Sequence, residues 1–87
     1  QPDYPAAYSN RGNLREANGD LSGALEDYNQ AINLQPDYVQ AYYNRGIVYW
    51  KQNDWQRCIT DWEKALELDP NYKLAKEWLP QARAKLK

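Results

Sequence analysis

The chain is built from a segment of 34 residues that occurs twice without a gap. Residues 2–35 read PDYPAAYSNRGNLREANGDLSGALEDYNQAINLQ, residues 36–69 read PDYVQAYYNRGIVYWKQNDWQRCITDWEKALELD, and twelve positions are identical. A third copy begins at Pro70 and continues for half a repeat. A fixed period of this length is typical of solenoids, in which each unit buries its apolar face only against its neighbours. We therefore expect one domain over residues 1–87, with repeat one at 2–35, repeat two at 36–69 and a capping helix at 70–87.

Each repeat carries two apolar stripes with helical spacing. In repeat two, the first stripe is Val39, Tyr42, Gly46 and Tyr49, and the second is Trp55, Cys58, Ile59, Trp62, Ala65 and Leu66. Steps of three and four residues place each set on one face of an α-helix, and the alternation that a strand requires is absent. The pattern predicts an all-α fold: an α-solenoid of two antiparallel helical hairpins plus a terminal solvating helix.

Turn and cap signals predict where the helices begin and end. Gly19-Asp20 and Asn53-Asp54 combine a residue that tolerates a left-handed turn with an aspartate that can cap the next helix. Gln35-Pro36 and Asp69-Pro70 end a helix because the residue before proline is disfavoured in helical geometry. The five helices are predicted at about residues 5–18, 21–34, 39–52, 55–68 and 73–86. Pro80 predicts a bend, or a break with restart, in the last of them.

The spaced aromatic and small residues resemble those of the tetratricopeptide repeat (TPR) family. Repeat two carries Tyr42, Arg45-Gly46, Tyr49, Cys58, Trp62 and Pro70, and repeat one carries Tyr8, Arg11-Gly12, Arg15, Ala24, Tyr28 and Pro36. Arg11 and Arg45 stand where the family usually has Leu, and we expect their stems to pack while the guanidinium groups reach water. Arg15 replaces an aromatic, which suits a solvent-facing end unit. The resemblance implies a non-catalytic module that binds a peptide or a helix in a concave groove.

Composition argues against catalysis and against cofactor binding. The chain has no His, and its single cysteine, Cys58, occupies a close-packing position with no base beside it. Neither metal-binding Cys/His clusters nor glycine-rich phosphate loops occur, so we expect no enzyme, no metal and no cofactor. One cysteine allows no internal disulfide, so the cytoplasm or another reducing compartment is compatible, but the compartment itself is unknown. Because the chain begins at Gln1 rather than Met, we expect a fragment, a processed form or an engineered protein.

Charge and hydropathy exclude other partner classes. The net charge is −1, with an excess of five acidic groups in residues 1–69 and of four basic groups in residues 70–87. An acidic body repels phosphates, so nucleic acid is not expected as a partner, and no apolar run could span a membrane. The basic tail has two interpretations: it is a solvated terminal helix, or it is a charged surface that attracts an acidic partner or promotes head-to-tail association.

The resemblance places the partner groove on the first helix of each repeat and on the last helix. The predicted groove residues are Ser9, Asn13, Tyr43, Asn44, Ile47, Trp50, Lys51, Leu74 and Trp78. Some TPR proteins clamp an acidic C-terminal tail with Lys, Asn, Asn, Lys and Arg; here Asn13 and Asn44 match the asparagines, whereas Ser9, Leu74 and Trp78 occupy the cationic positions. That specificity is therefore not expected.

Three interpretations of the apolar groove residues remain open. They form an exposed patch for a peptide partner, with Trp50 and Trp78 as anchors. Alternatively, Trp78 tilts inward and buries itself against Trp50, or further repeats cover the patch. A second hypothesis for the function is that the chain is a structural or engineered minimal repeat unit that assembles with itself. It would form a dimer or a larger homo-oligomer through the groove or the end surfaces, and hairpin exchange is one route.

Overall fold

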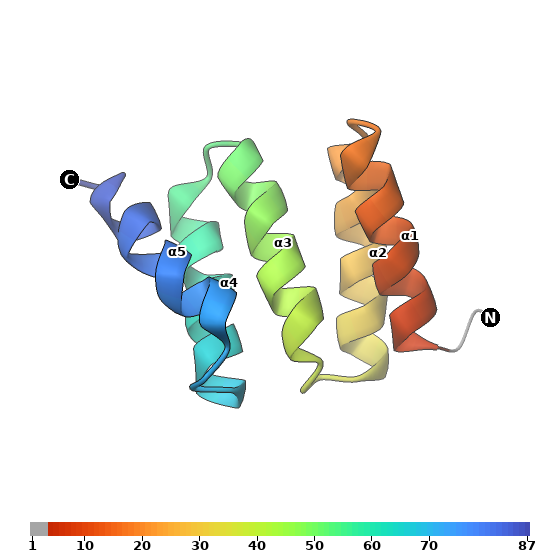
Figure 1. The fold of residues 1–87 in the computed structure, drawn as a ribbon. Helices are drawn as coiled ribbons and strands as arrows, with labels where there is room; N and C mark the ends of the chain where they lie inside the picture. The colour runs from red at the N-terminus through yellow and green to blue at the C-terminus, as the bar shows by residue number, and fades with distance from the viewer. Residues whose placement is uncertain (1–3) are drawn as a thin grey trace.

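The computed structural model describes residues 4–87 as a row of five helices with no strand among them (Figure 1). The helices are α1 (Pro5–Ala17), α2 (Leu21–Leu34), α3 (Val39–Lys51), α4 (Trp55–Leu68) and α5 (Lys73–Ala84). The prediction of an all-α solenoid with five helices is therefore confirmed. Pro2 and Asp3, with which the expected first repeat begins, lie outside the described residues. The body measures 41 × 27 × 17 Å, and none of the helices in residues 4–87 is long and apolar enough to cross a membrane.

The two hairpin turns have the geometry that their residues favour. Gly19 and Asn53 adopt positive φ angles of 86° and 61°, the left-handed conformation that ends a helix. The next residues are the aspartates that cap α2 and α4. Asp20 accepts a hydrogen bond from the Gly23 N–H at 2.9 Å, and Asp54 accepts one from the Arg57 N–H at 3.3 Å. Each hairpin is thus defined by residues within the turn itself.

Glycines on the first helix of each hairpin allow an aromatic ring of the second helix to lie against the backbone. A Cβ atom on Gly12 would lie 2.8 Å from Cε1 of Tyr28, and one on Gly46 would overlap the indole of Trp62. Tyr28 and Trp62 are almost fully buried. The hairpins therefore pack at the close approach that the small residues predict.

Arg11 and Arg45 bind buried carboxylates on the second helix of their own hairpin. Arg11 donates two hydrogen bonds to Asp27, and Arg45 donates two to Asp61. The Arg11 side chain keeps contact with water at 56% exposure, whereas that of Arg45 is 21% exposed, so its guanidinium reaches water less than the sequence suggested. The physical reason is that a buried carboxylate requires a charged partner.

Helix α5 continues through Pro80 without a break, so the alternative of a break with restart is wrong. Proline removes the N–H that would bond to the carbonyl of Lys76. Both residues are exposed, so that carbonyl lies on the solvent side of the helix, where water can replace the lost hydrogen bond. The buried face of α5 consists of Ala75, Leu79 and Ala82.

Candidate functional site: an apolar pocket between three helices

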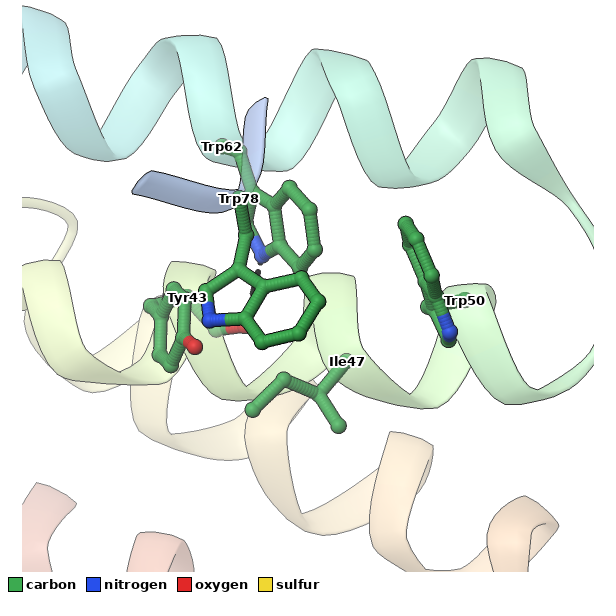
Figure 2. A pocket seen from close by; sticks show the side chains of 5 residues that line it. All are labelled: Tyr43, Ile47, Trp50, Trp62 and Trp78. Carbon is green, nitrogen blue, oxygen red and sulfur yellow. Dashed lines mark hydrogen bonds between the residues drawn. The ribbon is translucent and has the colours of Figure 1, made fainter. Parts of the chain in front are cut away.

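An apolar pocket of about 240 Å³ opens between α3, α4 and α5 (Figure 2). Its lining consists of Tyr43, Ile47, Trp50, Trp62 and Trp78. Pockets for drug-sized molecules usually measure about 300–1,000 Å³. This one is smaller, and its size suits a single bulky side chain of a partner.

Trp62 of α4 forms the floor of the pocket and is held in one orientation. Its Nε1–H donates a hydrogen bond to the backbone carbonyl of Tyr43 at 3.0 Å (dashed line in Figure 2). Its ring stacks on Tyr43 at 5.6 Å and on Trp50 at 5.8 Å between ring centroids, with interplanar angles of 21° and 25°. These are favourable offset-stacking distances. The floor is therefore preorganised, which lowers the entropic cost of binding.

Trp78 of α5 forms the outer wall of the pocket. Its indole meets Trp50 edge to face, with centroids 5.9 Å apart and an interplanar angle of 78°. Trp78 nevertheless remains 39% exposed. The structure thus combines two of the alternatives that the sequence left open: Trp78 does contact Trp50, but the contact leaves an open pocket.

Tyr43, Ile47, Trp50 and Trp78 are the predicted groove residues that line the pocket, and Trp62 is the one that the sequence analysis missed. Its spacing places it on the packing stripe of α4, and it does pack there, being only 2% exposed. One edge of the large indole reaches through to the pocket, however. A wide aromatic residue opposite a glycine is the signal that could have indicated this double role.

The other predicted groove residues lie outside this pocket. Ser9 is only 1% exposed, so the prediction that it lines an open groove is wrong. It lies one turn before Gly12, on a face of α1 that neighbouring helices cover. Leu74 is exposed on α5 but does not line the pocket, and Asn44 is half-buried on α3.

Asn13 and Lys51 take part in contacts with other helices. The hydroxyl of Tyr28 donates to Oδ1 of Asn13 at 2.5 Å. Lys51 forms an ion pair with Glu16 of α1 at 2.8 Å, which connects the two hairpins. Both residues therefore already have one partner within the chain.

The five residues that line the pocket favour binding over chemistry. Burial raises the pKa of Tyr43, so its hydroxyl is neutral and can donate or accept a hydrogen bond. Cys58 packs in the same hydrophobic cluster as Tyr43 and is fully buried, and this burial raises the pKa of its thiol to about 12. A thiol that stays protonated is a poor nucleophile. The site thus offers aromatic surface and no activated group.

Two family models match the sequence. One, described as a TPR repeat, matches residues 17–53, and the other, described as the tetratricopeptide repeat, matches residues 39–72. Together they span residues 17–72, more than half of the chain. No curated protein shows significant sequence similarity to it.

Solved structures with the same fold include two of RPAP3. The first TPR of Spaghetti (RPAP3) bound to the HSP90 peptide SRMEEVD matches with a TM-score of 0.93 and 28% identity, over 99% of this chain and 68% of that one. The NMR structure of the first TPR domain of human RPAP3 matches with a TM-score of 0.94 and the same identity and coverage.

The crystal structure of the MamA protein also matches, with a TM-score of 0.92 over 98% of this chain and 46% of that one. At 24% identity this similarity concerns the fold alone. The family models, the RPAP3 structures and the glycine–aromatic packing of both hairpins agree. The chain belongs to the tetratricopeptide repeat family.

Proposed function

We propose that this chain is a non-catalytic protein-interaction module that binds a peptide or a helix of a partner protein, and that residues 1–87 act as one unit. The observation that carries the proposal is the preorganised pocket of Tyr43, Ile47, Trp50, Trp62 and Trp78. Interface hot spots are enriched in Trp and Tyr and lie in well-packed pockets. A bulky apolar side chain of the partner would occupy this pocket, while Asn13 of α1 and Asn44 of α3 bind backbone groups elsewhere along the groove.

The charge of the groove argues against an acidic tail such as the peptide bound to the RPAP3 domain, SRMEEVD. The positions at which the family resemblance expects clamp cations carry Ser9, Leu74 and Trp78. Burying a carboxylate without a cation costs more free energy than its remaining hydrogen bonds return. We therefore expect SRMEEVD to bind this chain much more weakly than selected apolar peptides.

Trp78 is the best residue with which to test the pocket. Trp50 also packs on Trp55 and Trp62, so its removal would disturb the fold as well as the site. Trp78 is 39% exposed, and Leu74 on the same helix is 46% exposed but lies outside the pocket. Leu74→Ala is therefore a matched control for Trp78→Ala.

The experiment selects binding peptides from a displayed random library and measures their affinity for the two variants by titration calorimetry. Trp78→Ala should weaken binding more than about tenfold, near 1.4 kcal/mol, while Leu74→Ala changes it less than about twofold. Circular dichroism should show unchanged helicity in both. Equal affinity of the Trp78 variant and the wild type would exclude the pocket as the anchor site.

One observation favours self-assembly as a second candidate function. Leu14 of α1 is 68% exposed, whereas Val48, at the equivalent position of repeat two, is fully buried in a cluster with Ala24 and Tyr28 of α2. Helix α1 therefore exposes an apolar side chain at the position through which α3 packs onto α2. Light scattering behind size exclusion, from about 5 to 500 μM, should show a rising mass that Leu14→Glu abolishes; a constant monomer mass would contradict this candidate.

A further inference from the structure

Trp50 and Trp55 form an aromatic corner at the end of the α3–α4 hairpin. Their ring centroids are 5.1 Å apart, and their planes meet at 81°. Trp50 lies in the last turn of α3 and Trp55 is the first residue of α4, so a tight turn holds the two rings at this angle. Both side chains are half-buried.

The side chain of Lys85 occupies this corner. Its Nζ lies 5.7 Å from the ring centroid of Trp50 and 5.4 Å from that of Trp55. Both distances are within the range of about 6 Å for a cation–π interaction, and tryptophan is the strongest partner for it. Lys85 is exposed and follows the last residue of α5, Ala84. An ammonium group thus lies against two tryptophan rings that meet nearly at a right angle.

We propose that the Trp50–Trp55 corner is a binding site for an alkylammonium group, that Lys85 fills it in the free protein, and that a lysine side chain of the partner takes its place. The proposal rests on the proposed function and names the partner's chemistry. Trp50 belongs both to the corner and to the apolar pocket. The partner therefore carries a bulky apolar side chain for the pocket and a lysine side chain close to it.

Lys85 is suited to be a replaceable occupant. Its backbone N–H donates to the carbonyl of Ala82 in the last turn of α5, but no salt bridge holds its ammonium group within residues 4–87. A cation–π contact at an exposed site contributes only about 0.5–1 kcal/mol. A partner that adds apolar contacts in the neighbouring pocket can therefore displace it. Cations elsewhere on the surface, such as Lys51 and Arg83, are held in ion pairs with glutamates.

The test uses tetramethylammonium chloride as the probe and NMR of the four indole N–H groups as the readout, with sodium chloride at equal ionic strength as the reference. Lys85→Ala removes the tethered competitor, and Lys87→Ala is the matched control, because it also removes one exposed cation from the C-terminal turn. The Trp50 and Trp55 signals should shift most. The Lys85 variant should bind the probe about two- to fivefold more tightly than the wild type, and the Lys87 variant should bind like the wild type.

Two results would overturn the inference: equal affinity of the Lys85 variant and the wild type, or equal shifts of all four indole signals. Trp55→Leu adds a second check, since it removes one wall of the corner and should abolish saturable binding of the probe. Trp55 does not line the apolar pocket. Failure of this inference therefore leaves the Trp78 experiment unaffected, and failure of the pocket as an anchor site leaves the probe titration interpretable.

Discussion

Arg45 donates two hydrogen bonds to the buried carboxylate of Asp61: Nε donates to Oδ2 at 2.9 Å, and Nη2 donates to Oδ1 at 2.8 Å. Its remaining nitrogen, Nη1, donates to Oδ1 of Asn29 on α2 at 2.8 Å. One guanidinium therefore connects α3 with α4 in its own hairpin and with α2 in the preceding one. Arg11 makes the same two-point contact with Asp27, at 3.0 and 2.7 Å.

Arg45→Leu, which restores the usual family residue, should destabilise this protein. It leaves Asp61 buried and unpaired, which costs about 3–5 kcal/mol of unfolding free energy. The double variant Arg45→Leu/Asp61→Leu also removes the unpaired carboxylate, so it should recover most of the lost unfolding free energy. Urea unfolding followed by circular dichroism measures both; strictly additive losses would contradict the assigned ion pair.

Arg11→Leu should cost less than Arg45→Leu. Arg15 also approaches Asp27, with Nη1 and Oδ2 3.4 Å apart, so the carboxylate keeps a cation when Arg11 is removed. Asp61 has no second cation within salt-bridge distance among residues 4–87. The same urea titration compares the two variants, and an equal or larger loss for Arg11→Leu would show that Arg15 does not substitute.

Gly46→Ala should destabilise the chain although alanine favours helices. The gain in helix propensity is about 1 kcal/mol, but the new Cβ would overlap the indole of Trp62, which cannot move because its Nε1–H is bonded to Tyr43. Overpacking of this kind costs about 1–3 kcal/mol. Thermal unfolding should show a lower Tm for Gly46→Ala than for Gly12→Ala, whose Cβ meets the tyrosine ring less closely. A higher Tm than the wild type would refute the close approach.

Two substitutions in the hairpin turns should change the free energy of unfolding in opposite directions. Asn53 holds a φ of 61°, so Asn53→Gly relieves a strained conformation and should stabilise the fold by a few tenths to about 1 kcal/mol. Gly19 holds a φ of 86°, so Gly19→Ala should destabilise it by about 1 kcal/mol. Chemical unfolding measures the change in unfolding free energy of both variants. If both changes had the same direction, one of the turns would not have the left-handed geometry.

Burial of Cys58 predicts a loss of stability at alkaline pH. In the unfolded chain a thiol ionises near pH 8.5, whereas burial raises the pKa of Cys58 to about 12 in the folded state. Between these values the folded state holds a proton that the unfolded state has lost. The stabilising contribution is therefore complete below about pH 8.5 and falls by about 1.4 kcal/mol per pH unit above it.

Cys58→Ala isolates this contribution, because alanine is the residue at the equivalent position 24 of repeat one. Between pH 7 and pH 10 the wild type should lose about 2 kcal/mol more unfolding free energy than the variant. Urea titrations at the two pH values measure the difference. Parallel losses in both proteins would mean that the thiol ionises in the folded state as it does in the unfolded one.

Local signals predicted the helices correctly because each signal acts within a few residues. The left-handed residue and the capping aspartate at positions 19–20 and 53–54 end one helix and begin the next, and proline ends the second helix of each hairpin. The same local reasoning also allowed a break at Pro80, and that alternative was wrong. A proline on the exposed side of a helix loses a hydrogen bond that water can replace, so α5 continues through it.

The groove predictions were less accurate because exposure depends on how helices pack. The 34-residue offset pairs Ser9 with Tyr43, and both were placed in an open groove. The structure buries Ser9 and leaves Tyr43 only 7% exposed. Helical periodicity predicts which residues share one face of a helix. Whether that face is buried or exposed depends on where the neighbouring helices pack.

The sequence by itself determined the repeat and the helix boundaries, since these follow from periodicity and turn chemistry, and its composition shows that the chain has no histidine. Only the tertiary structure decided that Trp62 of α4 reaches the pocket, that Asp61 is the partner of Arg45, and that Lys85 lies on Trp50 and Trp55. Each of these contacts joins side chains that lie on different helices or just beyond the end of one. Their meeting depends on the distance and angle between helices, which packing determines and local sequence does not.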